Sequence, residues 1–196
     1  MSPHRTLKRA AATAAVAALT VVGAAVTATP ASAASCSVSW GSTAKKSAPM
    51  SSRELTNVRS GRHKCYDRLV IDLNGAAATS TGYDVRYVPA VVQDGSGLPV
   101  PLRGAADLQI VLKAPAYDTN GDPTYSPADP DELVNVSGYS TFRQVAYAGS
   151  FEGMTTIGLG VRARLPMRVK RIAGPGTAQR LVIDVEIGRA SCRERV

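Results

Sequence analysis

The amino-acid sequence predicts a mainly β protein, a single-domain antiparallel β-sandwich with one long proline-rich loop. Short blocks of alternating or branched apolar residues are separated by glycine, proline, asparagine and aspartate, which is typical of strands and turns. No block has the 3.6-residue apolar period of a long amphipathic helix. Between two atypical ends the chain has about 150 residues, which suits one domain with one core.

The first end, residues 1–33, is predicted to be a secretory signal peptide. Arg5, Lys8 and Arg9 form a basic start, an alanine- and valine-rich run follows, and Ala31-Ser32-Ala33 matches a signal-peptidase site. We therefore expect a secreted protein, free or associated with the cell envelope, without a transmembrane segment. Lipid attachment at Cys36 is the alternative, although residues 33–35 lack the usual aliphatic residue.

The other end, residues 186–196, reads EIGRASCRERV and resembles the translation of a common sequencing adapter. It shows no strand alternation and carries three arginines. We expect this segment to be non-native and exclude it from functional interpretation. A natural basic tail is the alternative.

Charge and cysteines narrow the class of protein. The formal net charge is +8, but several of the lysines and arginines lie in residues 1–33 and 186–196, so the rest of the chain is only mildly basic. A nucleic-acid partner is not expected, whereas a weak preference for anionic cell-wall polymers is compatible. Cys36 and Cys65 form an even pair, which in an oxidising compartment favours a disulfide over two free thiols. Its loop of ~30 residues would stabilise the fold by roughly 3–4 kcal/mol.

The predicted elements begin after a polar lead-in at residues 34–60, and a β domain spans 61–185. Its strands are expected at 67–74, 83–93, 98–102, 107–113, 140–148, 152–161, 167–172 and 179–185.

Three of these blocks have individual features. Two prolines in 98–102 predict an edge strand. Leu108, Ile110 and Leu112 share one face of 107–113. Gly158 and Gly160 are interpreted as close strand packing or a bulge rather than a phosphate-binding loop.

The pentapeptide RLVID occurs twice, at 68–72 and 180–184. Arginine and aspartate bracket three apolar residues, as expected for central strands with solvated ends. Because the flanking sequences differ and no fixed period recurs, we favour two similar strands over an internal duplication.

Residues 114–132 interrupt the strands with four prolines and an Asn-Gly turn. A loop this long inside a compact domain is more often functional than a short one. Residues 118–129 partly resemble an EF-hand calcium loop, but the glycine is misplaced and no helix flanks it. Asx turns also explain the pattern, and we expect no metal and no cofactor.

Catalytic motifs are sparse. His63 is the only histidine outside the predicted leader, so a zinc site lacks ligands, and no serine lies in a G-x-S-x-G elbow. We expect no enzymatic activity. The alternative is a secreted hydrolase that uses His63 with an unrecognised acid or serine, or with the thiol of Cys65.

Three segments, SGRHKCYDRLVIDL, GYDVRYV and above all FEGMTTIGLGVRARLPMRV, resemble the AMIN-like domain family of secreted bacterial proteins. The resemblance covers nearly all of residues 36–185. It implies an exported protein or lipoprotein. By analogy with the related AMIN domains, it implies a β-sandwich that targets the cell envelope through peptidoglycan.

We therefore expect a binding module for peptidoglycan or an associated glycopolymer. Sugars stack on aromatic faces, and cations pair with carboxylates or phosphates. The candidate ligand-binding residues are Tyr117, Tyr125, Tyr139, Phe142, Arg162 and Arg164. The two arginines are expected to share a strand face within a basic cluster that also holds Arg168, Lys170 and Arg171. A protein–protein module that uses the proline-rich loop is a further alternative.

Overall fold

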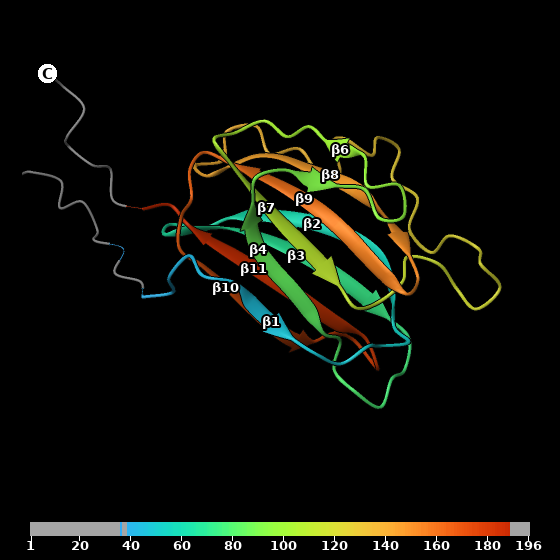
Figure 1. Cartoon of the computed structure of the whole chain (residues 1–196). Coiled ribbons are helices and arrows are strands. Elements are labelled where there is room, and N and C mark those ends of the chain that lie inside the picture. The colour runs from blue at the N-terminus through green and yellow to red at the C-terminus, as the bar shows by residue number, and fades with distance from the viewer. Residues whose placement is uncertain (1–35, 37–38, 189–196) are drawn as a thin grey trace, which may run out of the picture. The chain divides into compact units, whose positions relative to one another are not determined.

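The computed structural model describes Cys36 and residues 39–188, which contain eleven strands and no helix. The predicted signal peptide lies outside the described residues, as do residues 189–196 of the predicted tail. All strand pairs are antiparallel. Figure 1 shows the two larger sheets as the two layers of a sandwich, which confirms the predicted fold class.

The larger sheet has five strands in the order β1-β4-β7-β9-β8. Their bounds are β1 Lys45–Ser47, β4 Tyr83–Val88, β7 Ala106–Leu112, β9 Met154–Val161 and β8 Phe142–Phe151. Leu108, Ile110 and Leu112 of β7 are all fully buried, as their spacing predicts. The inner face of this sheet therefore supplies one half of the core.

The second sheet has four strands in the order β10-β11-β3-β2. Their bounds are β10 Met167–Ala173, β11 Gln179–Glu186, β3 Tyr66–Asn74 and β2 Glu54–Arg62. Leu69, Ile71 and Leu73 of β3 face the core, so the residues between them lie on the outer face of the sandwich.

The two RLVID segments pair with each other in the middle of this sheet. β3 and β11 are antiparallel neighbours, and Val70 lies opposite Val182 at the centre of the pairing. Because both segments have the same sequence, Arg68 lies opposite Asp184 and Asp72 lies opposite Arg180. Two central strands with matching ends therefore account for the twin pentapeptides.

A short hairpin of β5 (Val91–Val92) and β6 (Pro99–Val100) lies outside the two large sheets. The proline-containing β6 pairs only with β5, so it is an edge strand, as predicted. The predicted strand 83–93 was too long, because a bend at Pro89-Ala90 divides it into β4 and β5.

Two strands lie where the sequence predicted a polar lead-in. β1 and most of β2 fall within residues 34–60. In β2 the buried apolar residues are Leu55 and Val58, and a register shift between Leu55 and Asn57 disrupts the alternation. The apolar pattern of β2 is therefore weak in the sequence. At the other end, β11 continues to Glu186, one residue into the predicted tail.

The glycines of β9 allow close packing rather than phosphate binding. A Cβ atom on Gly160 would come within 2.0 Å of the carbonyl oxygen of Arg103. A side chain at this position would force the strand and the 102–105 segment apart, which confirms the interpretation as close packing.

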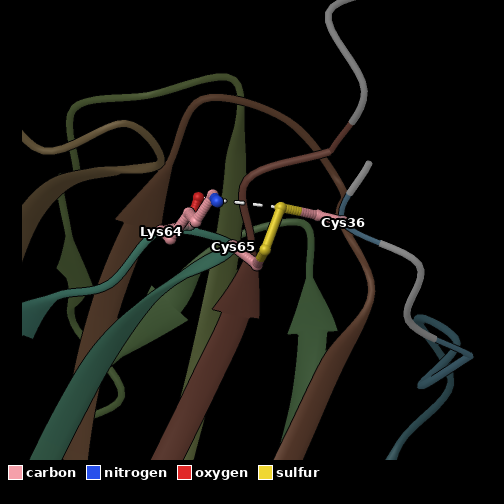
Figure 2. Close-up of a disulfide and its surroundings, with 3 residues drawn as sticks. All are labelled: Cys36, Lys64 and Cys65. Atoms are coloured by element: carbon pink, nitrogen blue, oxygen red, sulfur yellow. Dashed lines mark hydrogen bonds between the residues drawn. A yellow bond between two sulfur atoms is a disulfide. The ribbon is translucent and has the colours of Figure 1, made fainter. Parts of the chain in front are cut away.

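Cys36 and Cys65 form a disulfide with their Cα atoms 5.3 Å apart, as predicted (Figure 2). The Sγ atom of Cys36 also lies 3.7 Å from the carbonyl oxygen of Lys64. This is a contact rather than a hydrogen bond, because a disulfide sulfur carries no hydrogen. The bond ties the N-terminal segment to the start of β3 and leaves neither sulfur free for lipid attachment or nucleophilic attack.

Candidate functional site

The long loop predicted at residues 114–132 is held against the edge of β8 by backbone hydrogen bonds. The N–H of Tyr147 donates to the carbonyl of Pro130 at 2.6 Å, and the N–H of Leu133 donates to the carbonyl of Val145 at 2.8 Å. On the other side, the hydroxyl of Thr124 donates to the carbonyl of Leu55 in β2. The loop therefore also covers part of the free edge of β8.

The acidic part of this loop is an Asx turn. The carboxylate of Asp118 accepts the backbone N–H groups of Asn120 at 2.8 Å and Asp122 at 2.9 Å. Gly121 has a φ of +89°, a left-handed conformation that glycine adopts without steric cost. Within the described residues, no group of three His, Cys, Asp or Glu side chains could hold a metal ion. Backbone capping by Asp118 thus accounts for the EF-hand-like pattern.

The loop and β8 enclose a groove of about 430 Å³, here called the tyrosine groove. Three tyrosines, three prolines and small residues line it: Ala116, Tyr117, Gly121, Pro123, Tyr125, Ser126, Pro127, Pro130, Tyr147 and Ser150. Tyr117 and Tyr125, both predicted as ligand-binding residues, are thus brought together, and Tyr147 of β8 joins them. None of the lining residues carries a formal charge.

Neighbouring groups fix the three rings in place. Tyr125 and Tyr147 meet edge to face with ring centroids 5.8 Å apart, a favourable arrangement for aromatic pairs. The hydroxyl oxygen of Tyr117 accepts the backbone N–H of Gly153 at 2.8 Å. The hydroxyl of Ser150 lies between Ala116 and β9, where it accepts the N–H of Ala116 and donates to the carbonyl of Met154.

Burial further disfavours ionisation of two phenols of the groove, Tyr125 and Tyr147. It raises the pKa of Tyr125, and the neighbouring Tyr147 raises it further. Burial also raises the pKa of Tyr147, although a hydrogen bond with Ser150 partly opposes the shift. Both hydroxyls therefore stay protonated at neutral pH. The groove offers aromatic surface with hydroxyl donors and acceptors, which suits a ligand with apolar ring faces and many hydroxyls.

Tyr139 and Phe142 lie elsewhere, in a separate depression. Their rings stack with centroids 5.7 Å apart, and the hydroxyl of Tyr139 donates to Ser60 at 2.9 Å. Phe142 is only 1% exposed, so its selection as a surface ligand residue was wrong. Strand alternation places it in the core, and a lone aromatic at the start of a block does not reveal which face is buried.

Arg162 and Arg164 do not share a strand face, because β9 ends at Val161 and a bend follows. The guanidinium of Arg162 donates to the carbonyl of Ile187. Arg164 instead lies over the ring of Tyr87, 5.2 Å from its centroid, and donates to the carbonyl of Ser42. The predicted aromatic and basic residues are therefore divided among several sites, and only Tyr117 and Tyr125 line the tyrosine groove.

Tyr147 was missed by the sequence prediction. It sits in the middle of a predicted strand, where alternation alone cannot say whether it faces solvent, core or a neighbouring loop. Its contact with Tyr125 depends on how residues 114–132 fold back onto β8, which no local pattern encodes.

His63 is exposed, and its ring stacks on Tyr66 with centroids 4.5 Å apart. It lines a depression together with Ser60, Arg59, Arg68 and Arg180. The hydrolase alternative that uses His63 stays a prediction.

The model of the AMIN-like domain matches residues 53–187, from the residue before β2 to the residue after β11. The chain belongs to the AMIN-like family. An AMIN-like domain is a module associated with the cell envelope. β1 and Cys36 lie outside the matched range, whereas the tyrosine groove lies inside it.

No curated protein and no solved structure matches the chain. In the part of the chain that the structure describes, no helix is long and apolar enough to cross a membrane.

Proposed function

We propose that this AMIN-like protein is a secreted, non-enzymatic binding module of the cell envelope, and that its tyrosine groove holds a glycan strand of peptidoglycan. The observation that carries the proposal is the meeting of Tyr117, Tyr125 and Tyr147 in one uncharged groove. Family membership supports the envelope location, and the disulfide supports an oxidising compartment.

The chemistry of the groove favours a sugar chain over a charged ligand. A pyranose ring has a face of C–H groups that packs on an aromatic ring and a rim of hydroxyls that forms hydrogen bonds. Neutral tyrosines offer both surfaces at a small cost in conformational entropy, because each has only two side-chain torsions. The prolines stiffen the loop that carries Tyr117 and Tyr125, so less ordering is needed on binding.

The proposal is tested by co-sedimentation of the purified, oxidised protein with peptidoglycan sacculi. The variant Tyr125→Ala removes one ring from the groove, and we expect it to weaken binding by about 1–2 kcal/mol, or roughly 5- to 30-fold in Kd. Phe151→Ala is the matched control, since Phe151 is an aromatic residue that is 52% exposed and does not line the groove. It should bind as the wild type does.

Thermal unfolding of each variant separates lost binding from lost folding. Tyr125→Phe keeps the ring and should retain most of the affinity. Absence of co-sedimentation at low salt, or equal binding by Tyr125→Ala and wild type, would contradict the proposed function. If the protein bound an immobilised proline-rich peptide but not sacculi, this would point instead to a protein–protein module.

A further inference from the structure

The outer face of the four-stranded sheet carries a second polar site, far richer in charge than the tyrosine groove. Strand alternation directs the ends of both RLVID segments away from the core. There they meet cations from β2 and β10. We call this surface the arginine face and define it by Arg59, Arg68, Arg168 and Arg180 with Asp72 and Asp184.

Each aspartate on this face holds two arginines. Asp184, whose side chain is 0% exposed, accepts Nε of Arg68 at 2.6 Å and Nε of Arg168 at 2.7 Å. Asp72 accepts Nε of Arg59 at 2.7 Å and Nε of Arg180 at 3.2 Å. Since one carboxylate neutralises only one of two guanidiniums, each cluster retains a net positive charge.

Within each cluster one arginine binds its aspartate through two nitrogens, whereas the other, here called uncommitted, binds through one. Arg68 and Arg59 bind their aspartates through two nitrogens each. Arg168 and Arg180 use Nε alone, and within the described residues their terminal nitrogens have no hydrogen-bond partner. A guanidinium has five N–H donors, so both side chains keep most of their donors for a ligand.

The uncommitted arginines are nevertheless held in position. The guanidinium of Arg168 lies 4.1 Å from the ring centroid of Trp40 and 5.2 Å from that of Tyr66. Arg180 is placed by Asp72 and lines the depression of about 330 Å³ that also contains His63. Ordered donors lose less conformational entropy when an anion binds.

The two clusters lie at opposite ends of the paired pentapeptides. Asp72 and the Arg68–Asp184 pair are four residues apart along β3, which corresponds to about 13 Å. Between them Val70 and Val182 lie at the centre of the strand pairing, the exposed Lys170 of β10 lies opposite Val182, and Ile172 lies opposite Arg180. A ligand that reaches both clusters must therefore carry several anionic groups along its length.

From this arrangement we propose that the arginine face binds a linear polymer whose units are joined by phosphodiesters. A phosphate accepts paired N–H donors from a guanidinium, and its repeated charge matches the two cationic centres. The site is separate from the tyrosine groove and does not depend on the function proposed for that groove.

The test measures binding of a fluorescent glycerol-phosphate oligomer to the purified, oxidised protein by anisotropy. Arg168→Gln and Arg180→Gln each remove an uncommitted guanidinium, while Arg68 and Arg59 continue to pair with the aspartates. We expect each variant to lose about tenfold in affinity, and the double variant to lose measurable binding.

Arg86→Gln is the matched control. Arg86 of β4 shares Asp84 with Lys46 on the other sheet, so this change also removes one of two cations around a single carboxylate. It alters the net charge equally and should leave oligomer binding unchanged. Tyr125→Ala should also bind the oligomer normally, which separates this proposal from that for the groove.

Three outcomes would overturn the proposal. The first is absence of oligomer binding at low salt. The second is wild-type affinity in the Arg168→Gln, Arg180→Gln double variant. The third is equal affinity for a polyglutamate of the same charge, which would show a general cation surface without preference for phosphodiesters. Urea unfolding of each variant shows that losses are not due to misfolding.

Discussion

The tyrosine groove and the arginine face differ in charge and in construction. The groove is uncharged and built from a long loop packed on β8, whereas the arginine face is cationic and built on β-strands. Stacking and neutral hydrogen bonds depend little on ionic strength, while exposed ion pairs are screened by salt. One sandwich thus presents two surfaces that salt should distinguish.

The origin of the two surfaces in the sequence also differs. The arginine face follows from a local pattern, since each RLVID segment directs its arginine and aspartate to the same side of the strand. The groove depends on the packing of residues 114–132 against β8, a strand that does not directly follow them in the sequence. Local pattern therefore places the arginine and aspartate of each segment on one face, whereas the meeting of the two segments with Arg59 and Arg168 depends on strand order, as the groove depends on the loop.

The largest expected effect is a loss of folding stability when Asp184 is replaced, and this loss should exceed that for Asp72, the other aspartate of the arginine face. Asp184→Ala should destabilise the protein by about 3–5 kcal/mol, because its side chain is 0% exposed and its loss leaves two arginines without their partner. Asp72→Ala should cost about 1–2 kcal/mol, because Asp72 is 20% exposed and water can replace it. Urea unfolding measures both, and equal losses would contradict this ranking.

The disulfide adjoins the arginine face, because Cys65 precedes Tyr66, whose ring contacts the guanidiniums of Arg68 and Arg168. The double change Cys36→Ser, Cys65→Ser should cost about 3 kcal/mol, from the entropy of a loop with a sequence separation of 29. In the folded variant, oligomer binding should weaken while sacculus binding persists. If the double variant lost sacculus binding to the same extent as oligomer binding, this would contradict the separation of the two sites.

Acid should affect Asp72 on the arginine face and Asp94, in the turn between β5 and β6, in opposite directions. A hydrogen bond from Arg59 lowers the pKa of Asp72, so its stabilisation is complete above the unfolded pKa and is lost as pH falls through the folded one. Burial raises the pKa of Asp94, which lies near Tyr147, so its contribution is present at low pH and is lost as pH rises.

Two asparagine variants test these signs by urea unfolding across pH. Asp72→Asn should be destabilised near neutral pH and approach the wild type at about pH 3. Asp94→Asn should match or exceed wild-type stability near neutral pH and lose that advantage in acid. A reversed order for either variant would contradict the assigned pKa shift.

Much of the fold could be predicted from local patterns. The apolar alternation of 107–113 and the twin blocks RLVID identified central strands, and the proline pair in 98–102 identified an edge. β2 was not predicted, because few of its residues are buried and apolar and because a bulge shifts its register. The pairing of the two pentapeptides was also not predicted, since strand order depends on long-range packing.

The site was predicted less well. The long proline-rich loop was predicted from its prolines and Asn-Gly turn, and two of its tyrosines share the groove. Phe142 is in the core, and Arg162 and Arg164 bind neighbouring backbone carbonyls rather than line one surface. Composition shows that aromatic and basic residues are present, but their burial and partners are set by tertiary contacts.

One experiment tests the two-surface account most directly: co-sedimentation across a salt series with intact cell walls and with walls stripped of phosphodiester-linked polymers. Stripped walls should retain the protein at all salt concentrations, in a manner that requires Tyr125 but not Arg180. Intact walls should bind additional protein that is released by salt and requires Arg168 and Arg180. With two phosphate contacts, a fourfold rise in salt should weaken this second component by about sevenfold. Salt-sensitive binding to stripped walls, or the same loss from Tyr125→Ala and Arg180→Gln on both materials, would contradict the account.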